Sequence, residues 1–141
     1  MVGQIRVLLA DDEKAFLDSL VKVLSRRGIA ARTAYDGRAA LEVLSHEQFD
    51  VIVLDVRMPV MDGLAALREI RRTDTLTPVL LLSGQADLGY VGEAMKGGAA
   101  DYLLKPCDID TLISAIENAH ERKKIRMEVA QESPKKQPRS K

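Results

Sequence analysis

Five short apolar runs that alternate with segments of helical periodicity constrain the fold of this 141-residue chain more than any other feature. Three of them, at 5–10, 51–54 and 79–82, consist almost entirely of Val, Ile, Leu and Ala and show no polar alternation. Such continuous runs are typical of strands that are buried on both faces of a parallel sheet. The runs at 29–34 and 102–104 are more mixed, as expected for strands nearer the edges. We therefore predict five strands.

The segments between the runs have the spacing of amphipathic helices. Phe16, Leu20 and Leu24 recur every four residues, and Gly28 is placed to end their helix. Apolar residues with similar spacing predict four more helices, at Ala40, Leu41 and Leu44, at Leu64, Leu67 and Ile70, at Leu88, Val91 and Met95, and at Leu112, Ile113 and Ile116. Strands that alternate with helices of this length favour right-handed crossovers. We therefore predict a doubly wound α/β fold whose parallel sheet is covered on both faces.

Charge divides the chain into an acidic body and a basic C-terminal stretch. Residues 122–141 contain eight Lys or Arg and two Glu, a balance of +6, and residues 1–121 carry −6 because the whole chain has 21 basic and 21 acidic residues. We expect one domain over 1–121, an extension of the last helix over 122–130 and a disordered basic tail over 131–141, whose composition is too polar to bury a core. An acidic body also argues against direct nucleic-acid binding by the domain.

The sequence predicts a cytoplasmic protein. Its N-terminal apolar run is short and is followed at once by acidic residues, which is unlike a signal peptide, and no apolar stretch reaches the length of a membrane span. Cys107 is the only cysteine, which excludes an internal disulfide and a multi-cysteine metal site and fits a reducing compartment.

Polar side chains stand at the ends of four of the five predicted strands. In an open parallel sheet, ligands bind beyond the carboxyl ends of the strands, near the point where the strand order switches. The residues at these ends are Asp11, Asp12 and Glu13 after the first strand, Asp55 at the third, Ser83 at the fourth and Lys105 at the fifth. Taken singly, each could be a helix cap or a surface residue. Asp55, however, closes the apolar run VIVLD, where an unpaired carboxylate is costly to desolvate.

This combination of side chains suits phosphoryl chemistry with a metal ion. Carboxylates that gather at one edge repel one another, and a divalent cation or a proton relieves the repulsion. Oxygen ligands without a nearby His or Cys favour Mg2+ over zinc. With the cation in place, Asp55 can attack a phosphoryl group as a nucleophile, while Lys105 adds positive charge and the Ser83 hydroxyl can bind one phosphoryl oxygen.

Four segments carry these residues in a distinctive order and spacing: LLADDE, VIVLDVRMPVMDG, LLLSG and DYLLKP. In them the chain resembles the receiver domain of bacterial response regulators, which act in two-component signal transduction. The resemblance extends from about residue 5 to residue 119 and includes the specific pattern DxxMPxMDG after an apolar strand. It implies a flavodoxin-like fold similar to that of chemotaxis regulators, with five parallel strands in the order 2-1-3-4-5 and five helices.

The resemblance also implies roles for the acidic residues at the strand ends. Asp55 matches the phosphorylated aspartate, Asp12 a direct metal ligand and Asp11 a ligand that acts through water. Arg57 stands where a backbone carbonyl completes the shell of the metal ion, which the resemblance implies to be Mg2+.

Further roles fall on the fourth and fifth strands. Ser83 and Lys105 match the hydroxyl and the lysine that bind the phosphoryl group. The Lys105–Pro106 bond is similar to one that is cis in the family, and Tyr102 falls on the aromatic position that switches together with the hydroxyl residue. Tyr102 also has a simpler explanation, because an aromatic side chain near the edge of a sheet often serves packing alone.

The resemblance implies a signalling switch and not a metabolic enzyme. Asp55 would take a phosphoryl group from a phosphohistidine of a sensor histidine kinase or a histidine phosphotransfer protein. The face built from the fourth helix, the fifth strand and the fifth helix, which includes Lys96 and Tyr102, would then bind an output partner or a second copy of the chain. Gly89 and Gly92 lie within the fourth helical segment, and we expect them to make it mobile.

Three other functions compete with this interpretation. A phosphatase of the haloacid-dehalogenase type needs a second acid two residues after its nucleophile, where this chain has Arg57. A flavin-binding electron carrier needs a phosphate loop rich in Ser, Thr and Gly after the first strand, where this chain has Asp-Asp-Glu. A phosphorylation-independent interaction module of the same fold is the stronger alternative, because only the complete set of acid, hydroxyl and lysine argues against it.

Overall fold

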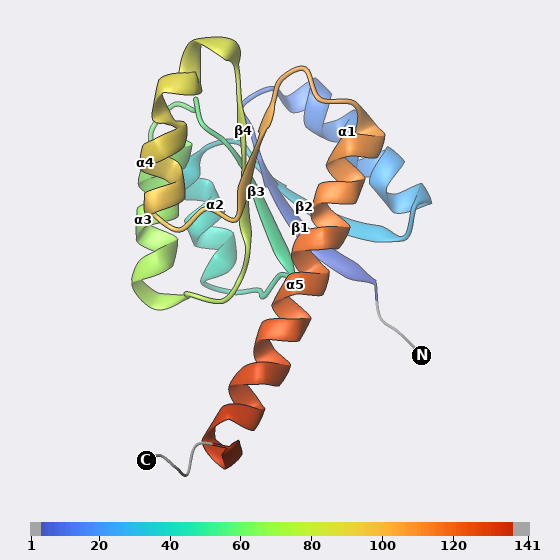
Figure 1. Ribbon diagram of the computed structural model, residues 1–141. Helices are drawn as coiled ribbons and strands as arrows, with labels where there is room; N and C mark the ends of the chain where they lie inside the picture. The colour runs from blue at the N-terminus through green and yellow to red at the C-terminus, as the bar shows by residue number, and fades with distance from the viewer. Residues whose placement is uncertain (1–3, 137–141) are drawn as a thin grey trace.

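The structure is a computed structural model that describes residues 4–136, with side chains for residues 4–130. Five parallel strands form one sheet in the order β2-β1-β3-β4-β5, as Figure 1 shows. The strands are β1 (Ile5–Ala10), β2 (Ile29–Ala34), β3 (Val51–Asp55), β4 (Val79–Ser83) and β5 (Asp101–Leu104). The predicted fold class and strand order are confirmed.

Helices cover both faces of the sheet. They are α1 (Lys14–Arg26), α2 (Gly37–Leu44), α3 (Gly63–Thr73), α4 (Val91–Lys96) and α5 (Ile109–Lys136), and a 3-10 turn, η1 (Gln85–Tyr90), precedes α4. Helices α1 and α5 lie on one face of the sheet, and α2, α3 and α4 lie on the other (Figure 1). Because all five strands are parallel, their carboxyl ends point to the same edge of the sheet, which is the upper edge in this view.

The core has two parts because side chains of a strand alternate between the two faces of the sheet. Val7 and Val53 belong to the cluster under α1 and α5, whereas Leu8 and Ile52 belong to the cluster under the other three helices. Strands β3 and β4 are buried along their whole length, and β1 is buried from Val7 onward. Burial on both faces explains why these runs lack polar alternation.

The start of α3 lies directly against the end of β3. The Asp62 side chain accepts a hydrogen bond from the Ala65 backbone N–H at 2.8 Å and so caps the helix. A Cβ atom on Gly63 would collide with the backbone oxygen of Asp55, so glycine permits the close approach of the two segments. The pair Asp62-Gly63 thus holds the loop that follows Asp55 close to the end of its own strand.

The fourth helix differs from the sequence prediction. The segment that contains Leu88 forms the 3-10 turn η1, and α4 is limited to Val91–Lys96. Leu88 and Met95 are 42% and 43% exposed, so the apolar spacing does not form a buried stripe. The glycines at 89 and 92 lower the helix propensity of this segment, and the short α4 anchors itself through the small buried Ala94 instead.

Helix α5 continues past the body of the molecule to Lys136, as its lower half in Figure 1 shows. The sequence prediction placed the end of the helical extension at residue 130 and a disordered tail after it. The backbone of residues 131–136 is helical, although this segment contains Pro134, a residue that is unfavourable inside a helix. The rest of the predicted tail, residues 137–141, lies outside the described residues.

None of the helices in the described part of the chain combines the length and the apolar character that a membrane crossing requires.

Candidate functional site

Three carboxylates meet at the carboxyl edge of the sheet. Asp11 and Asp12 follow β1, Asp55 ends the neighbouring strand β3, and each of the three offers an oxygen within 4.8 Å of the others. Asp11 and Asp55 are buried, with exposures of 0% and 5%, whereas Asp12 is exposed. Because β1 and β3 are adjacent, the predicted acidic residues are brought together by the topology of the sheet alone.

Lys105 reaches into this acidic cluster from the end of β5. Its Nζ donates to the Oδ2 of Asp11 at 2.9 Å and to the Oδ2 of Asp55 at 3.2 Å, and it lies 3.7 Å from a carboxylate oxygen of Glu13. The Lys105 backbone N–H donates to the Ser83 carbonyl at 2.8 Å, and the Lys105–Pro106 peptide bond is cis. One ammonium group thus partly neutralises the carboxylates of two strands.

The pKa values of Asp55 and Lys105 are both raised, by burial and charge for Asp55 and by its carboxylate partners for Lys105. Burial and the nearby charge of Asp11 raise the pKa of Asp55 to about 6, although Lys105 and the Arg57 backbone N–H act in the opposite direction. Burial lowers the pKa of Lys105, but its hydrogen bonds and charge interactions with Asp11 and Asp55 outweigh that effect and raise it. Lys105 is therefore a fixed cation, and Asp55 is an unusually basic carboxylate that is still mostly ionised at pH 7.

Ser83 presents an unused hydroxyl beside Asp55. Strands β3 and β4 pair Asp55 with Leu82, so Ser83 lies one position further along the adjacent strand. The residue is 1% exposed, and among the described residues its Oγ has no hydrogen-bond partner. A buried hydroxyl without a partner is costly, so this position favours a ligand oxygen that would accept its hydrogen bond.

Tyr102 and Lys96 lie on the outer side of the molecule. Tyr102 is in β5, opposite Leu81 of β4, and it is 36% exposed. The residue is therefore partly exposed near the edge of the sheet, and both the switch role and the packing explanation of Tyr102 stay predictions. Lys96 is exposed at the end of α4. The site residues predicted from the sequence thus divide between the strand ends and this outer surface.

One charged residue of this region was not singled out from the sequence. Asp87, in η1, is 4% exposed, and its Oδ1 accepts a hydrogen bond from the Nε of Arg57 at 2.5 Å. Its Oδ2 accepts from the Gly84 backbone N–H at 3.3 Å. From the sequence, the backbone carbonyl of Arg57 is expected to serve the metal site, and the structure also gives its side chain a specific partner. An acid three residues after Gly84 is a capping signal that could have indicated Asp87, but its burial depends on the tertiary fold.

Comparisons with known proteins agree with this geometry. The family described as "Response regulator receiver domain" matches residues 7–117. The Regulatory protein AtoC of Escherichia coli is 36% identical over 124 residues, which are 88% of this chain and 27% of that protein. The chain thus spans about a quarter of the length of this relative.

Solved structures show the same likeness. The receiver domain of the Francisella response regulator 1452 is 35% identical, with a TM-score of 0.79 over 84% of this chain and 98% of that one. NtrX from Brucella abortus, in complex with ADP, is 32% identical, with a TM-score of 0.84 over 90% of this chain and 29% of that one. The family match covers most of the chain, and the chain belongs to the response regulator receiver domain family.

Proposed function

We propose that Asp55 accepts a phosphoryl group from a phosphohistidine of a sensor histidine kinase or a histidine phosphotransfer protein, with the aid of Mg2+. Receiver domains of response regulators are phosphorylation-based signalling switches, and the chain belongs to that family. The observation that carries the assignment to Asp55 is its position within 3.2 Å of Lys105 and within the carboxylate cluster. The charge of Lys105 and of a cation held by the cluster would offset the repulsion between the Asp55 carboxylate and an anionic phosphoryl group.

The carboxylate cluster fits a hard divalent cation. Its donor atoms are oxygens of Asp11, Asp12 and Asp55, without His or Cys, which is the donor set that Mg2+ prefers. Asp12 and Asp55 would hold the ion directly, Asp11 through water, and the Arg57 backbone carbonyl would complete the protein ligands. The bound ion supplies positive charge that makes the approach of an anionic phosphoryl group to a carboxylate favourable.

The chain's own residues provide the rest of the transfer. A carboxylate oxygen of Asp55 forms a bond to phosphorus while the bond between phosphorus and the donor's imidazole nitrogen breaks, and the electron pair leaves with the imidazole. Asp55 must be ionised to attack, and a pKa of about 6 leaves most of it ionised at pH 7. Lys105 already holds the Asp55 carboxylate and can pair with the new phosphoryl oxygens.

Ser83 is the residue through which we expect phosphorylation to be sensed. Its buried Oγ lacks a partner among the described residues, so it can donate to a phosphoryl oxygen without giving up an existing bond. That new contact would favour an arrangement of the segment after β4 that the unphosphorylated chain populates less. The phosphoryl group can shift the equilibrium between the two arrangements only by as much as its contacts with Ser83 and Lys105 are more favourable in one arrangement than in the other.

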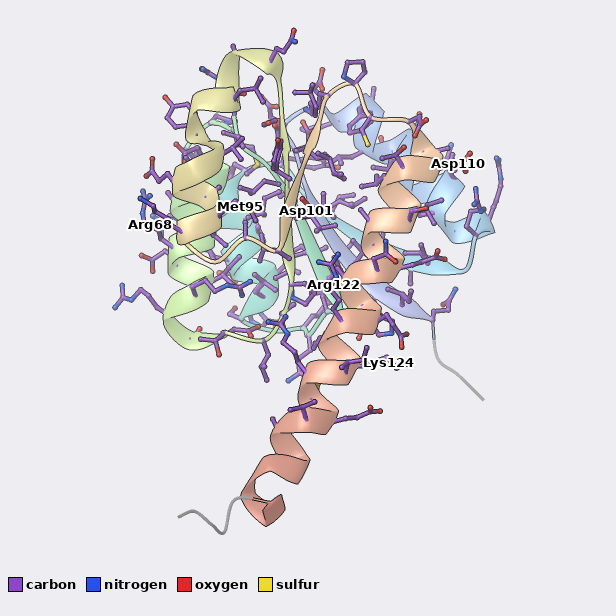
Figure 2. All side chains as sticks on the ribbon, in the orientation of Figure 1. Arg68, Met95, Asp101, Asp110, Arg122 and Lys124 are labelled. Carbon is purple, nitrogen blue, oxygen red and sulfur yellow. The ribbon has the colours of Figure 1, made fainter. Side chains whose placement is uncertain are left out.

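The face built from α4, β5 and α5 is the proposed output surface. It exposes apolar side chains next to the segment that follows Ser83: Met95, Tyr102 and Leu104 are 43%, 36% and 40% exposed. Figure 2 shows Met95 on α4, on the side of the helix nearer β5. An output partner or a second copy of the chain would cover these side chains.

The cytoplasmic location and the lack of direct nucleic-acid binding stay predictions.

The test is incubation with Mg2+ and acetyl phosphate, followed by intact mass measurement. We expect the chain to gain one phosphoryl group and Asp55→Asn to gain none. Asp18→Asn, which changes an exposed acid of α1 outside the cluster, is the matched control and should be labelled like the wild type. A folded wild-type chain that gains no mass would favour the phosphorylation-independent interaction module.

A further inference from the structure

The Arg57–Asp87 ion pair connects the two loops that flank the phosphoacceptor site. Arg57 follows Asp55 by two residues, and Asp87 follows Ser83 by four. The pair joins the Nε of Arg57 to the Oδ1 of Asp87 at 2.5 Å, while the other oxygen of Asp87 accepts the Gly84 N–H. A single carboxylate therefore ties the segment after the phosphoacceptor to the segment after the hydroxyl residue.

The two partners of this ion pair differ in solvent access. The Asp87 side chain is 5% exposed and the Arg57 side chain is 67% exposed. Asp87 is thus almost completely removed from water, and its backbone contact with Gly84 is long at 3.3 Å. A buried carboxylate that loses its cationic partner is destabilised, whereas an arginine that lies mainly in solvent loses little when its partner is removed. The ion pair therefore matters more for the position of η1, which carries Asp87, than for the position of Arg57.

The two residues of the ion pair line the same hollow as Asp12, a proposed metal ligand. This hollow, of about 450 Å³, is lined among others by Asp12, Arg57, Asp87 and Tyr90. A phosphoryl group added to Asp55 brings about two negative charges to this region. It would attract the Arg57 guanidinium, which binds phosphoryl oxygens well, and would repel the Asp87 carboxylate. Phosphorylation is therefore expected to weaken the pair from both sides.

We propose that Asp87 is a positioning residue whose ion pair with Arg57 latches the segment after β4 in its unphosphorylated arrangement. This inference rests on the proposed function, because it describes how phosphorylation of Asp55 would be resisted and then transmitted. Any movement of Ser83 toward a phosphoryl group carries the adjacent Gly84, whose N–H is bound by Asp87. The movement therefore pulls on the Arg57–Asp87 contact, and opening of the latch frees η1 and α4 to rearrange.

Two single substitutions test the latch, with hydrogen exchange and phosphorylation as independent readouts. Asp87→Asn removes the charge but retains an oxygen that can accept the Gly84 N–H, and Arg57→Gln removes the cation while leaving the backbone carbonyl in place. In the absence of a phosphodonor, we expect both to speed exchange of residues 84–96 roughly fivefold, with exchange in β1 and β3 unchanged. With acetyl phosphate and Mg2+, we expect initial labelling roughly threefold to tenfold faster than in the wild type.

A double-mutant cycle separates a coupled pair from two unrelated effects. If Arg57 and Asp87 act through each other, the double variant Arg57→Gln with Asp87→Asn should be affected no more than the more strongly affected single variant, and the two effects should not multiply. Arg68→Gln is the matched control, because it removes another Arg–acid pair, to Glu93, that joins α3 to α4 at 3.4 Å with both partners exposed. Figure 2 shows Arg68 on the outer surface of α3. We expect this control to change neither readout.

The outcomes distinguish the latch from the proposed function. Wild-type labelling together with unchanged exchange and labelling in both single variants would overturn the latch alone. Multiplicative effects in the double variant would also overturn it. A wild-type chain that gains no phosphoryl group would overturn the proposed function. Should Asp87→Asn reduce the folded fraction, Arg57→Gln tests the same pair, since the side chain that it changes lies mainly in solvent.

Discussion

The Nζ of Lys105 lies 3.2 Å from the Oδ2 of Asp55, although 50 residues separate them in the sequence. This contact joins β5 to β3 across β4, and the same Nζ also binds Asp11 at the end of β1. One lysine thus connects the ends of three strands at the candidate site. Its charge offsets carboxylates that the fold places close together, which has consequences for stability as well as for phosphoryl transfer.

The raised pKa of Asp55 predicts that this carboxylate destabilises the folded chain at neutral pH. The pKa rises from its ordinary value of 3.8 to about 6, so between those values the folded chain binds a proton that the unfolded chain has released. The contribution of Asp55 to stability therefore falls as pH rises through this window and is least favourable above it. In the absence of Mg2+, we expect Asp55→Asn to raise the free energy of unfolding at pH 7 by roughly 1–2 kcal/mol.

The pH dependence provides the check on that expectation. Urea unfolding of both chains between pH 4 and pH 8 should show the advantage of Asp55→Asn shrinking as the pH falls below 6, because the wild-type carboxyl is then neutral as well. Lys105 keeps its contact with Asp11 in the variant, which limits the loss of ion pairing. A variant that is less stable than the wild type at pH 7 would contradict this account of the site.

The carboxylate cluster predicts stabilisation by Mg2+. A ligand that binds only the folded chain at ten times its dissociation constant adds roughly 1.4 kcal/mol to the free energy of unfolding. We expect Mg2+ to raise the melting temperature of the wild type and to have little effect on Asp12→Asn, which lacks the exposed member of the cluster. Asp18→Asn should respond like the wild type. An equal Mg2+ response in Asp12→Asn would exclude Asp12 as a metal ligand.

Much of the fold and the site could be predicted because local sequence and sheet topology agree. The continuous apolar runs predicted the strands, since residues buried on both faces have no reason to alternate. Asp12, Asp55 and Ser83 lie at one edge of the sheet because each ends or follows a strand that points to that edge. For such residues, position after a strand is sufficient to predict proximity.

The features that could not be predicted depend on contacts between distant segments. Asp87 is buried and bound to Arg57 of a distant loop, and nothing in the local sequence indicates that partner. Leu88 and Met95 have helical spacing, yet they are exposed because the glycine-containing segment forms a 3-10 turn and a short helix. The roles of the site residues and the mobility of this segment stay predictions.

Arg71 is expected to be a major source of stability at the opposite edge of the sheet. Its guanidinium donates to the Gly98 carbonyl from Nε and Nη2 at 3.1 and 2.8 Å, and from Nη1 to the carbonyls of Asp74 and Thr77 at 3.0 and 2.8 Å. It thereby joins the end of α3, the entry to β4 and the turn before β5. We expect Arg71→Met to lower the free energy of unfolding by roughly 2–3 kcal/mol, because partly buried carbonyls lose their donor.

The neighbouring arginine is the control for this effect. The Arg72 side chain is 74% exposed, and its ion pair with Glu69 spans 3.4 Å on the surface of α3. We expect Arg72→Met to change the free energy of unfolding by less than about 0.5 kcal/mol. Chemical denaturation of the two variants tests the comparison, and similar losses in both would show that the contacts of Arg71 with backbone carbonyls are not important for stability.

Val60 adopts a backbone conformation that is unfavourable for a β-branched residue. Its φ is 69° in the loop between β3 and α3, and the residue is 78% exposed, so little packing offsets the strain. Val60→Gly should therefore raise the free energy of unfolding by roughly 0.5–1 kcal/mol, even though glycine increases the entropy of the unfolded chain. Val60→Ala keeps the Cβ atom and should gain less. Thermal unfolding of the wild type and the two variants tests this expectation. The strain comes from the Cβ atom, so its removal should stabilise the chain. A glycine variant that is the least stable of the three would contradict the argument.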